Sequence, residues 1–443
     1  MEVRIRQYWF NIRNSLWFLP TIMAISATML AFGFLELDNH ITYKDFPIGW
    51  FIYGGQREGA RSVLSTIASS MVTIAGVTFS ITLVALTMAS SQFGPRLLRN
   101  FISDKGNQFV IGTFIATFIY SLIVLLNIGG SGEEVFIPKI SVVFAFLLAV
   151  LSLGVLIYFI HHVTTSIQAD YIIKSSFNDF IRLTNTYLLK EDENIEQVDS
   201  TSSLKQVRSE YLLSTDIFFF NSGFIQSVDY QGACKWAEKN NLVIEWLVFP
   251  GSFVTVYQRF SIVHHKSSLP QKAEQQLQDF IAIGYQRTPN QDLLYSLKQI
   301  VEVGVRALSP GINDPHTAIT CIQWIGAAMS ELSKKKFDSP VLNDKNGSFR
   351  VIKKQITYQD IADTCFDQLR LYARSNVYVV MEMLFAIKRT LRITNHKEFG
   401  KALQEKAEDL YHETIQQLDG PQKRAIEKTH REIMQLYQQI MML

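Results

Sequence analysis

The sequence predicts an α-helical membrane protein with four transmembrane helices, followed by a cytoplasmic α+β region that consists of a small β module and a helical domain. Three observations carry this prediction: four long apolar segments near the N-terminus, strand-like apolar runs in the middle, and helix periodicity beyond them. A chain of 443 residues also exceeds the usual size of one domain. We expect a transmembrane domain at 1–165, a connecting helix and polar loop at 166–205, a mostly-β module at 206–270 and a helical domain at 271–443.

Each apolar segment has the ~20 apolar residues that a helix needs to cross a bilayer. The segments run from Leu16 to Leu37, from Val63 to Ser91, from Phe109 to Ile128, and from Ile140 to Val163. The first segment is long for a signal peptide, and no small-residue cleavage site precedes a soluble mature chain. We therefore interpret it as a retained span.

Charged residues between the spans predict their orientation. Basic residues lie between spans two and three and after span four, whereas the loop between spans three and four is acidic. The basic residues are Arg96, Arg99, Lys105, Lys174 and Arg182, and the acidic loop holds Glu133, Glu134 and a single lysine, Lys139. By the positive-inside rule both termini are cytoplasmic, although the first loop also contains basic residues.

After the spans, Ile167 to Gln197 resembles a helix, and the stretch EDENIEQVDSTSS resembles a loop. Three strand-like runs follow, DIFFFNSGFIQSV, NLVIEWLVF and SFVTVYQRFSIVH, with FPGS as the turn between the last two. Tyr230 to Lys239 can form one short helix between the first two runs. From Gln271 we expect helices to the end of the chain. They are Asn290 to Leu308, Pro315 to Leu332, Tyr358 to Thr390 and Lys397 to Met442.

Two helix boundaries follow from local chemistry. In RTPNQD, Thr288 can cap a helix that has Pro289 at its first position and Gln291 completing a capping box. In RALSPGINDPHTA, one helix should end before Pro310, with Gly311 tolerating a positive φ. The next helix should begin at Pro315 with Asp314 as its cap. In this corner Arg306, Asn313 and Asp314 form either a polar site or a purely structural turn.

Several features occur together in this chain: four N-terminal spans, SSQFGPRLLRNF at the end of span two, GFIQSVDY and FPGSFV in the β module, and RALSPGINDPHTA. In this combination the chain resembles the bacterial inner-membrane family known as domain of unknown function 2254. The turn in the β module of such proteins commonly reads PGDF, and here Ser252 replaces the acid, so no carboxylate role is carried over to that position. The resemblance implies a multi-pass protein of the bacterial inner (plasma) membrane and implies no activity.

Span two carries small and polar residues along one side of the helix. At a period of seven they are Ser62, Thr66, Ser69, Thr73, Gly76, Ser80 and Thr87, and the opposite side is expected to carry Val63, Ile67, Met71, Ile74, Ile81 and Met88. One interpretation is a close helix–helix contact, because small residues let backbones approach. The other is the wet wall of a pore or cavity in an oligomer.

The length of span two bears on these interpretations. From Ser62 to Phe93 the segment has 32 residues, and at ~1.5 Å per residue it exceeds a hydrocarbon core of about 30 Å. Arg96 and Arg99 follow its end, where they could attract anions at a pore mouth or serve as ordinary flanking charges.

Sequence signatures of an enzyme are mostly missing. The chain has no GxxxxGK[ST], GxGxxG after a strand, HExxH or GxSxG, so we expect no enzyme. The pairs His161/His162 and His264/His265 cannot each chelate a metal, because adjacent side chains diverge on helices and strands. We expect no cofactor and no metal. The three cysteines show no CxxC spacing, and a net charge of +2 does not favour nucleic acid as a partner.

These observations favour an ion channel or other transport protein: a homo-oligomer in membrane lipid whose second span lines a conduit for inorganic ions, with a cytoplasmic region that assembles or gates it. The alternative is a membrane-anchored sensor or scaffold whose cytoplasmic region binds a ligand or a protein. A lipid-modifying enzyme ranks third, because no Asp or Glu lies in the middle of a span.

Overall fold

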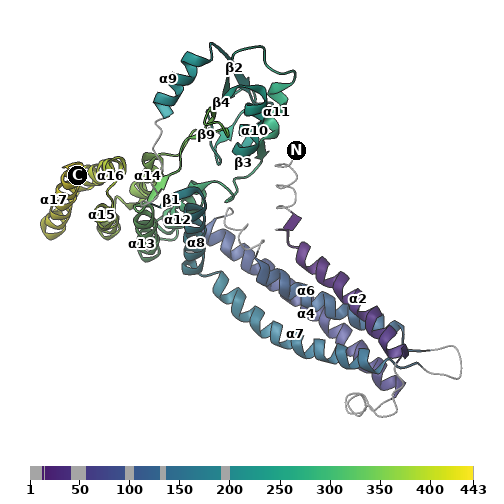
Figure 1. Ribbon diagram of the computed structural model, residues 1–443. Helices are drawn as coiled ribbons and strands as arrows, with labels where there is room; N and C mark the ends of the chain where they lie inside the picture. The colour runs from purple at the N-terminus through teal and green to yellow at the C-terminus, as the bar shows by residue number, and fades with distance from the viewer. Residues whose placement is uncertain are drawn as a thin grey trace. The chain divides into compact units, whose positions relative to one another are not determined.

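The computed structural model describes residues 12–13, 15–40, 56–94, 104–129, 136–190 and 200–442, without the side chains of 190 and 200–203. The chain divides into two compact units, one ending at Tyr171 and the other beginning at Ile172 (Figure 1). In its described residues the N-terminal unit has helices and no strand. The C-terminal unit contains the described strands and the remaining helices.

The N-terminal unit contains four apolar helices at the predicted positions. They are α2 (Phe18–His40), α4 (Arg57–Phe93), α6 (Lys105–Leu126) and α7 (Lys139–Ser166). Each is long and apolar enough to cross a membrane, which confirms the four predicted apolar helices in the described part of the chain. At 37 residues α4 exceeds even the expected length.

The core of the N-terminal unit lies around α6. Its side chains Val110, Phe114 and Tyr120 are fully buried. Small residues allow α2 to approach α6 closely, since a Cβ atom added at Gly112 would lie only 3.2 Å from the Cα of Pro20. The four helices therefore form a packed bundle.

A buried carboxylate connects α2 to α7. Asp38, near the end of α2, accepts hydrogen bonds from the backbone N–H groups of Ile140 and Ser141 at 3.0 and 2.9 Å, and from the Ser141 hydroxyl at 2.6 Å. The residue before α7 is Pro138, whose side chain provides no cap. Asp38 thus satisfies the first N–H groups of α7 from another helix.

The described residues of the C-terminal unit form three sheets. The five-stranded sheet has the order β2-β6-β4-β10-β9, the three-stranded sheet β5-β3-β7, and the two-stranded sheet β1-β8. The strands are β1 (Leu188–Lys190), β2 (Leu213–Phe218), β3 (Gly223–Val228), β4 (Val243–Trp246), β5 (Phe253–Val254), β6 (Arg259–His265), β7 (Ile281–Gly284), β8 (Lys335–Phe337), β9 (Val341–Asn343) and β10 (Phe349–Ile352). Pairing is antiparallel except between β4 and β10.

Helices cover both faces of the five-stranded sheet. Val243 and Ile352 pack with Val207 of α9 (Ser200–Glu210) on one face. Ile244 packs with Ala233 of α10 (Tyr230–Asn240) on the other, so the central strand β4 is buried along its whole length. The predicted helix at Tyr230 to Lys239 is confirmed. The helix α9 was not predicted, because its sequence is polar.

The prediction of only helices after Gln271 is wrong, because β7, β8, β9 and β10 all lie beyond it. These strands have three or four residues each, too few to show a period of two. The expected helix to Gln197 is also too long, since α8 (Ala169–Tyr187) gives way to β1.

Six longer helices complete the unit. They are α12 (Leu293–Ala307), α13 (Pro315–Leu332), α14 (Tyr358–Ala373), α15 (Val377–Leu391), α16 (Lys397–Ile415) and α17 (Gly420–Met442), and the short α11 (Ala273–Asp279) precedes β7. The predicted helices Tyr358 to Thr390 and Lys397 to Met442 are each broken in two. Asn376 caps α15, and Gly420 has φ +68 at the start of α17.

The predicted capping box in RTPNQD is wrong. The helix begins at Leu293, after Asp292. Thr288 instead donates a hydrogen bond to the carbonyl of Gln226, and the Gln291 amide bonds both the N–H and the carbonyl of Val228 at 2.8 and 3.2 Å. Contacts to β3 thus replace the local cap and attach this segment to the sheet.

Candidate functional site

The polar face of α4 points away from the helix bundle. All seven of its small and polar residues are exposed: Ser62, Thr66, Ser69, Thr73, Gly76, Ser80 and Thr87. The buried residues of α4, such as Leu64, Met71 and Ala85, lie on the opposite side and pack into the bundle core. The described residues of the bundle therefore make no tight contact through the polar face.

The hydroxyls on this face bond to the helix that carries them. Thr73 donates to the carbonyl of Ser69 at 3.0 Å, and Ser80 donates to that of Gly76 at 2.9 Å. Nothing lies within 4 Å of a Cβ atom added at Gly76. The face is thus a shallow polar surface whose hydroxyl oxygens can still accept hydrogen bonds.

The expected apolar side of α4 needs a correction in its second half. Ile67 and Met71 are buried as predicted, but Ile81 and Met88 are 43% and 48% exposed. Thr78, Thr82, Ala85 and Ala89 take the buried positions there. A strict period of seven drifts around a helix of 3.6 residues per turn, and small residues fit the close contact with α6 better than large ones do.

The predicted pore-mouth residues Arg96 and Arg99 lie outside the described residues. The corner RALSPGINDPHTA is described in full. Asp314 caps α13 as predicted, accepting bonds from the Thr317 N–H at 3.1 Å and its hydroxyl at 2.5 Å. Pro315 is the first helical residue.

Two other features of the corner differ from expectation. The residue with positive φ is Asn313, at +48°, and Gly311 is not among the residues with positive φ. Arg306 participates through its carbonyl, which accepts from Ser309, and its guanidinium has no hydrogen-bond partner among the described residues. The three corner residues thus lie close in the chain, but their contacts are those of a helix–turn–helix connection.

The histidine pairs do not form metal sites in the described residues. His162 bonds Asp104 at 2.9 Å, His264 bonds Glu245 at 3.1 Å, and His265 bonds Thr215 at 2.9 Å. Within the described ranges, no group of three or more His, Cys, Asp or Glu residues is arranged to hold a metal ion. The three cysteines are buried and form no disulfide among the described residues, and burial raises the pKa of Cys365 to about 12.

A cavity of about 510 Å³ opens in the C-terminal unit where the parallel strands β4 and β10 end. After Trp246 the backbone stays hydrogen-bonded to β6. After Ile352 the backbone is instead bonded to the segment before β9, because the Lys353 N–H donates to the Pro340 carbonyl. The two strands therefore separate at this point. A crevice at the carboxyl ends of parallel strands is a common place for a ligand. Its volume suits a small molecule.

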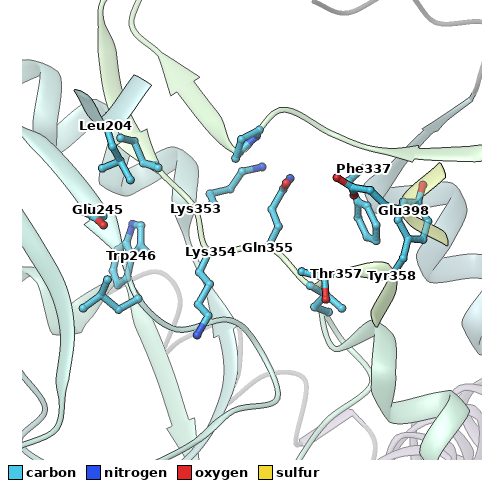
Figure 2. Close-up of a pocket in the computed structure, with 14 residues that line it drawn as sticks. Leu204, Glu245, Trp246, Phe337, Lys353, Lys354, Gln355, Thr357, Tyr358 and Glu398 are labelled. Carbon is cyan, nitrogen blue, oxygen red and sulfur yellow. The ribbon is translucent and has the colours of Figure 1, made fainter. Parts of the chain in front are cut away.

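Figure 2 shows the segment of Lys353, Lys354 and Gln355 running between Trp246 on one side and Tyr358 on the other. Lys353 pairs with Asp338 at 2.6 Å, and Gln355 bonds the same residue. Lys354 and Glu398 are exposed, and neither has an ion-pair partner within the described part of the chain.

Aromatic rings pack against one another in the wall of this cavity: Phe337 meets Tyr358 edge to face, and Phe399 stacks on Tyr358 from behind the wall. The Tyr358 ring lies 5.0 Å from that of Phe337 and 4.9 Å from that of Phe399. Trp246 is 2% exposed, and its indole N–H has no partner among the described residues. Sequence reasoning missed this cavity because the four-residue strand β10 was not recognised. The available signal was the pair Glu245 and Trp246 inside the apolar run VIEWLVF.

Four helices that are long and apolar enough to cross a membrane, followed by a folded unit of sheets and helices, are the architecture of a predicted membrane protein. The chain belongs to the family described as Predicted membrane protein (DUF2254), whose model matches residues 13–389. Uncharacterized proteins of Mycobacterium tuberculosis and Mycobacterium bovis are 31% identical to it over 342 residues. The match covers 76% of this chain and 64% of each relative, so the chain spans less than two thirds of their length. No solved structure matches the chain.

Proposed function

We propose that copies of this protein assemble in the bacterial inner membrane with their α4 helices around a shared axis, forming a conduit for inorganic ions. The observation that carries the proposal is that every small or polar residue predicted for this face is exposed and lies opposite the bundle core. A face of hydroxyls gains little from lipid, whereas a wet axis hydrates its oxygens. Closed cyclic symmetry is the common solution for such assemblies.

The length of α4 supports the same arrangement. Its 37 residues extend roughly 56 Å at 1.5 Å per residue, against a hydrocarbon core of about 30 Å. The helix therefore tilts or projects from the bilayer, where it can transmit motion to a gate. Both termini are cytoplasmic in this proposal, and the C-terminal unit assembles or gates the copies.

Replacing Thr73 or Ser80 by Asp tests the conduit. In a wet lumen the added ring of carboxylates stays hydrated, so conductance and cation preference should rise. In a dry contact the unpaired charge costs several kcal/mol, and the protein should misassemble. Gly76→Leu should reduce current while the oligomer survives. Planar-bilayer recording and the amount of oligomer in detergent are measured for each variant.

Phe79→Asp is the matched control for Ser80→Asp. The two residues are adjacent, so they share a depth in the membrane but point about 100° apart, and Phe79 is 50% exposed. Phe79→Asp should lower the amount of protein that accumulates, because its charge meets lipid or a neighbouring helix. Intact Ser80→Asp oligomers with no current and no altered permeability would reject the conduit.

The cavity at the ends of β4 and β10 favours a second candidate, a membrane-anchored sensor. Lys354 and Glu398 offer unpaired charges beside the aromatic wall of Phe337 and Tyr358, a combination that suits a small ligand carrying charged groups. A panel of anionic and zwitterionic metabolites should include one that raises the melting temperature of the full chain. That shift should vanish in Lys354→Ala and persist in Lys345→Ala, and a panel without any such compound disfavours the sensor.

A further inference from the structure

We propose that an anionic glycerophospholipid binds in a groove between α6 and α7, with its acyl chain along the apolar walls and its headgroup phosphate on Lys105. The groove belongs to the N-terminal unit and is separate from the exposed polar face of α4. The proposal does not depend on the conduit or on the sensor.

The groove is a cavity of about 490 Å³ on the side of the bundle. Phe109 of α6 faces it together with residues of α7 that recur at helical spacing, and the full lining is Lys105, Gly106, Phe109, Leu151, Gly154, Val155 and Tyr158. Nothing lies within 4 Å of a Cβ atom added at Gly154, so the absence of a side chain there keeps the groove open. Because both helices are membrane-length and apolar, the space opens toward lipid tails.

Polar groups gather at only one end of this groove. Lys105 is the first residue of α6, it is exposed, and it has no ion-pair partner within the described ranges. Tyr158 stands at the same end, 46% exposed, with its ring stacked on His162 at 5.3 Å. Tyrosine and lysine at the end of an apolar helix are typical of the headgroup level of a bilayer.

The neighbouring acid, Asp104, bonds to groups other than Lys105. Asp104 accepts bonds from the Gly106 N–H at 2.6 Å, the Asn107 N–H at 3.2 Å and His162 at 2.9 Å. Its carboxylate is therefore engaged by the start of α6 and by α7. Among the described residues that line the groove, the Lys105 ammonium is the cation without an ion-pair partner, which favours a phosphate-bearing anion over a neutral lipid.

Native mass spectrometry of the full chain in detergent tests the proposal, with phosphatidylglycerol and phosphatidylcholine as the added lipids. The wild type should retain phosphatidylglycerol more strongly. Lys105→Gln should lower that preference about fivefold, the effect expected for one lysine beside an anionic headgroup. Gly154→Leu should reduce retention of both lipids, because it fills the groove.

Two matched controls separate this site from general membrane charge and helix damage. Lys174→Gln is the control for charge, because it removes a lysine of α8 that lies outside the groove. Gly33→Leu is the control for size, because a Cβ atom added at Gly33 also has nothing within 4 Å. Both should bind lipid as the wild type does. A wild type without headgroup preference, or equal losses in Lys105→Gln and Lys174→Gln, would overturn the site. Loss of oligomer without loss of lipid in Gly154→Leu would instead identify the groove as a contact between copies.

Discussion

Single carboxylates position the starts of several helices in this protein. Asp314 caps α13, Asp104 caps α6, and Asp38 supplies the cap for α7 from a helix about a hundred residues earlier. Only Asp314 was predictable, because it directly precedes a proline at the first helical position. The partner of Asp38 depends on the packing of α2 against α7, which no local pattern encodes.

The cap at Asp314 should make stability depend on pH. The Thr317 hydroxyl bond, followed by backbone N–H bonds, lowers the pKa of Asp314 below its ordinary value. A lowered folded pKa means that the charged cap stabilises the fold above the unfolded pKa of about 3.9 and that this contribution is lost as the pH falls through the folded value. Asp314→Ala should therefore cost about 1 kcal/mol at pH 7 and less at pH 3.

Thermal unfolding of both proteins across this pH range provides the measurement, with Asp314→Asn as a control that keeps an acceptor without the charge. A difference between wild type and Asp314→Ala that is the same at pH 3 and pH 7 would contradict the role of the charge. Unchanged stability with lost activity would instead make the corner a ligand site.

The left-handed backbone at Asn313 gives a second expectation at the same corner. Asn313→Val should destabilise the protein by about 1–2 kcal/mol, because a branched side chain is strained at positive φ. Gly311→Val should have a smaller effect, since nothing lies within 4 Å of its added Cβ. Melting temperatures of the two variants decide the point, and a larger loss at Gly311 would show that the positive φ at Asn313 is not the constraint.

At the scale of elements, the sequence was most informative where a pattern was long. The four apolar helices and α13 lie where periodicity and caps predicted them. The short strands β8, β9 and β10 were missed, because three or four residues show no period. Pattern length also decided which candidate site was predictable. The polar face of α4 was predicted from a repeat over 26 residues, Ser62 to Thr87. The cavity beside Trp246 was not predicted, because it depends on the pairing of two strands that are distant in the sequence.

The contact between α2 and α7 should prove sensitive to one side chain. Asp38→Ala removes the acceptor for two N–H groups and one hydroxyl. Each unpaired buried donor costs about 1–3 kcal/mol of stability at most sites. The melting temperature of the bundle should therefore fall, and the first turn of α7 should fray. Glu36→Ala is the matched control on α2, since its ion pair with His40 is exposed and worth little. Equal melting temperatures of Asp38→Ala and Glu36→Ala in detergent would argue against the cap between α2 and α7.

At the scale of the whole molecule, four apolar helices and a large α+β unit share one chain. In the proposed arrangement the four spans place both termini on one side of the membrane. The native cysteines suit a test of this layout. All three are buried, and burial raises the pKa of Cys365, so they should react slowly with thiol reagents. An introduced cysteine can then report its own side of the membrane.

Asn127 and Asn346 are both exposed and lie on opposite sides in the proposed orientation. Asn127→Cys should react with a membrane-impermeant maleimide in intact cells, because it follows α6 at the outer end. Asn346→Cys, in the turn between β9 and β10, should react only after lysis. Labelling of Asn346→Cys in intact cells would reverse the orientation, and the unmodified protein provides the background.

The parallel pairing of β4 with β10 has a consequence for how the chain folds during synthesis. Its partners, Ile244 and Val351, are more than a hundred residues apart, so the middle of the sheet stays open until the ribosome has passed Ile352. Closing so long a loop is slow compared with forming local helices. A chain that ended before Phe349 would expose the edge of β4, where another nascent chain could pair. Truncations on either side of β10 should therefore differ sharply in aggregation.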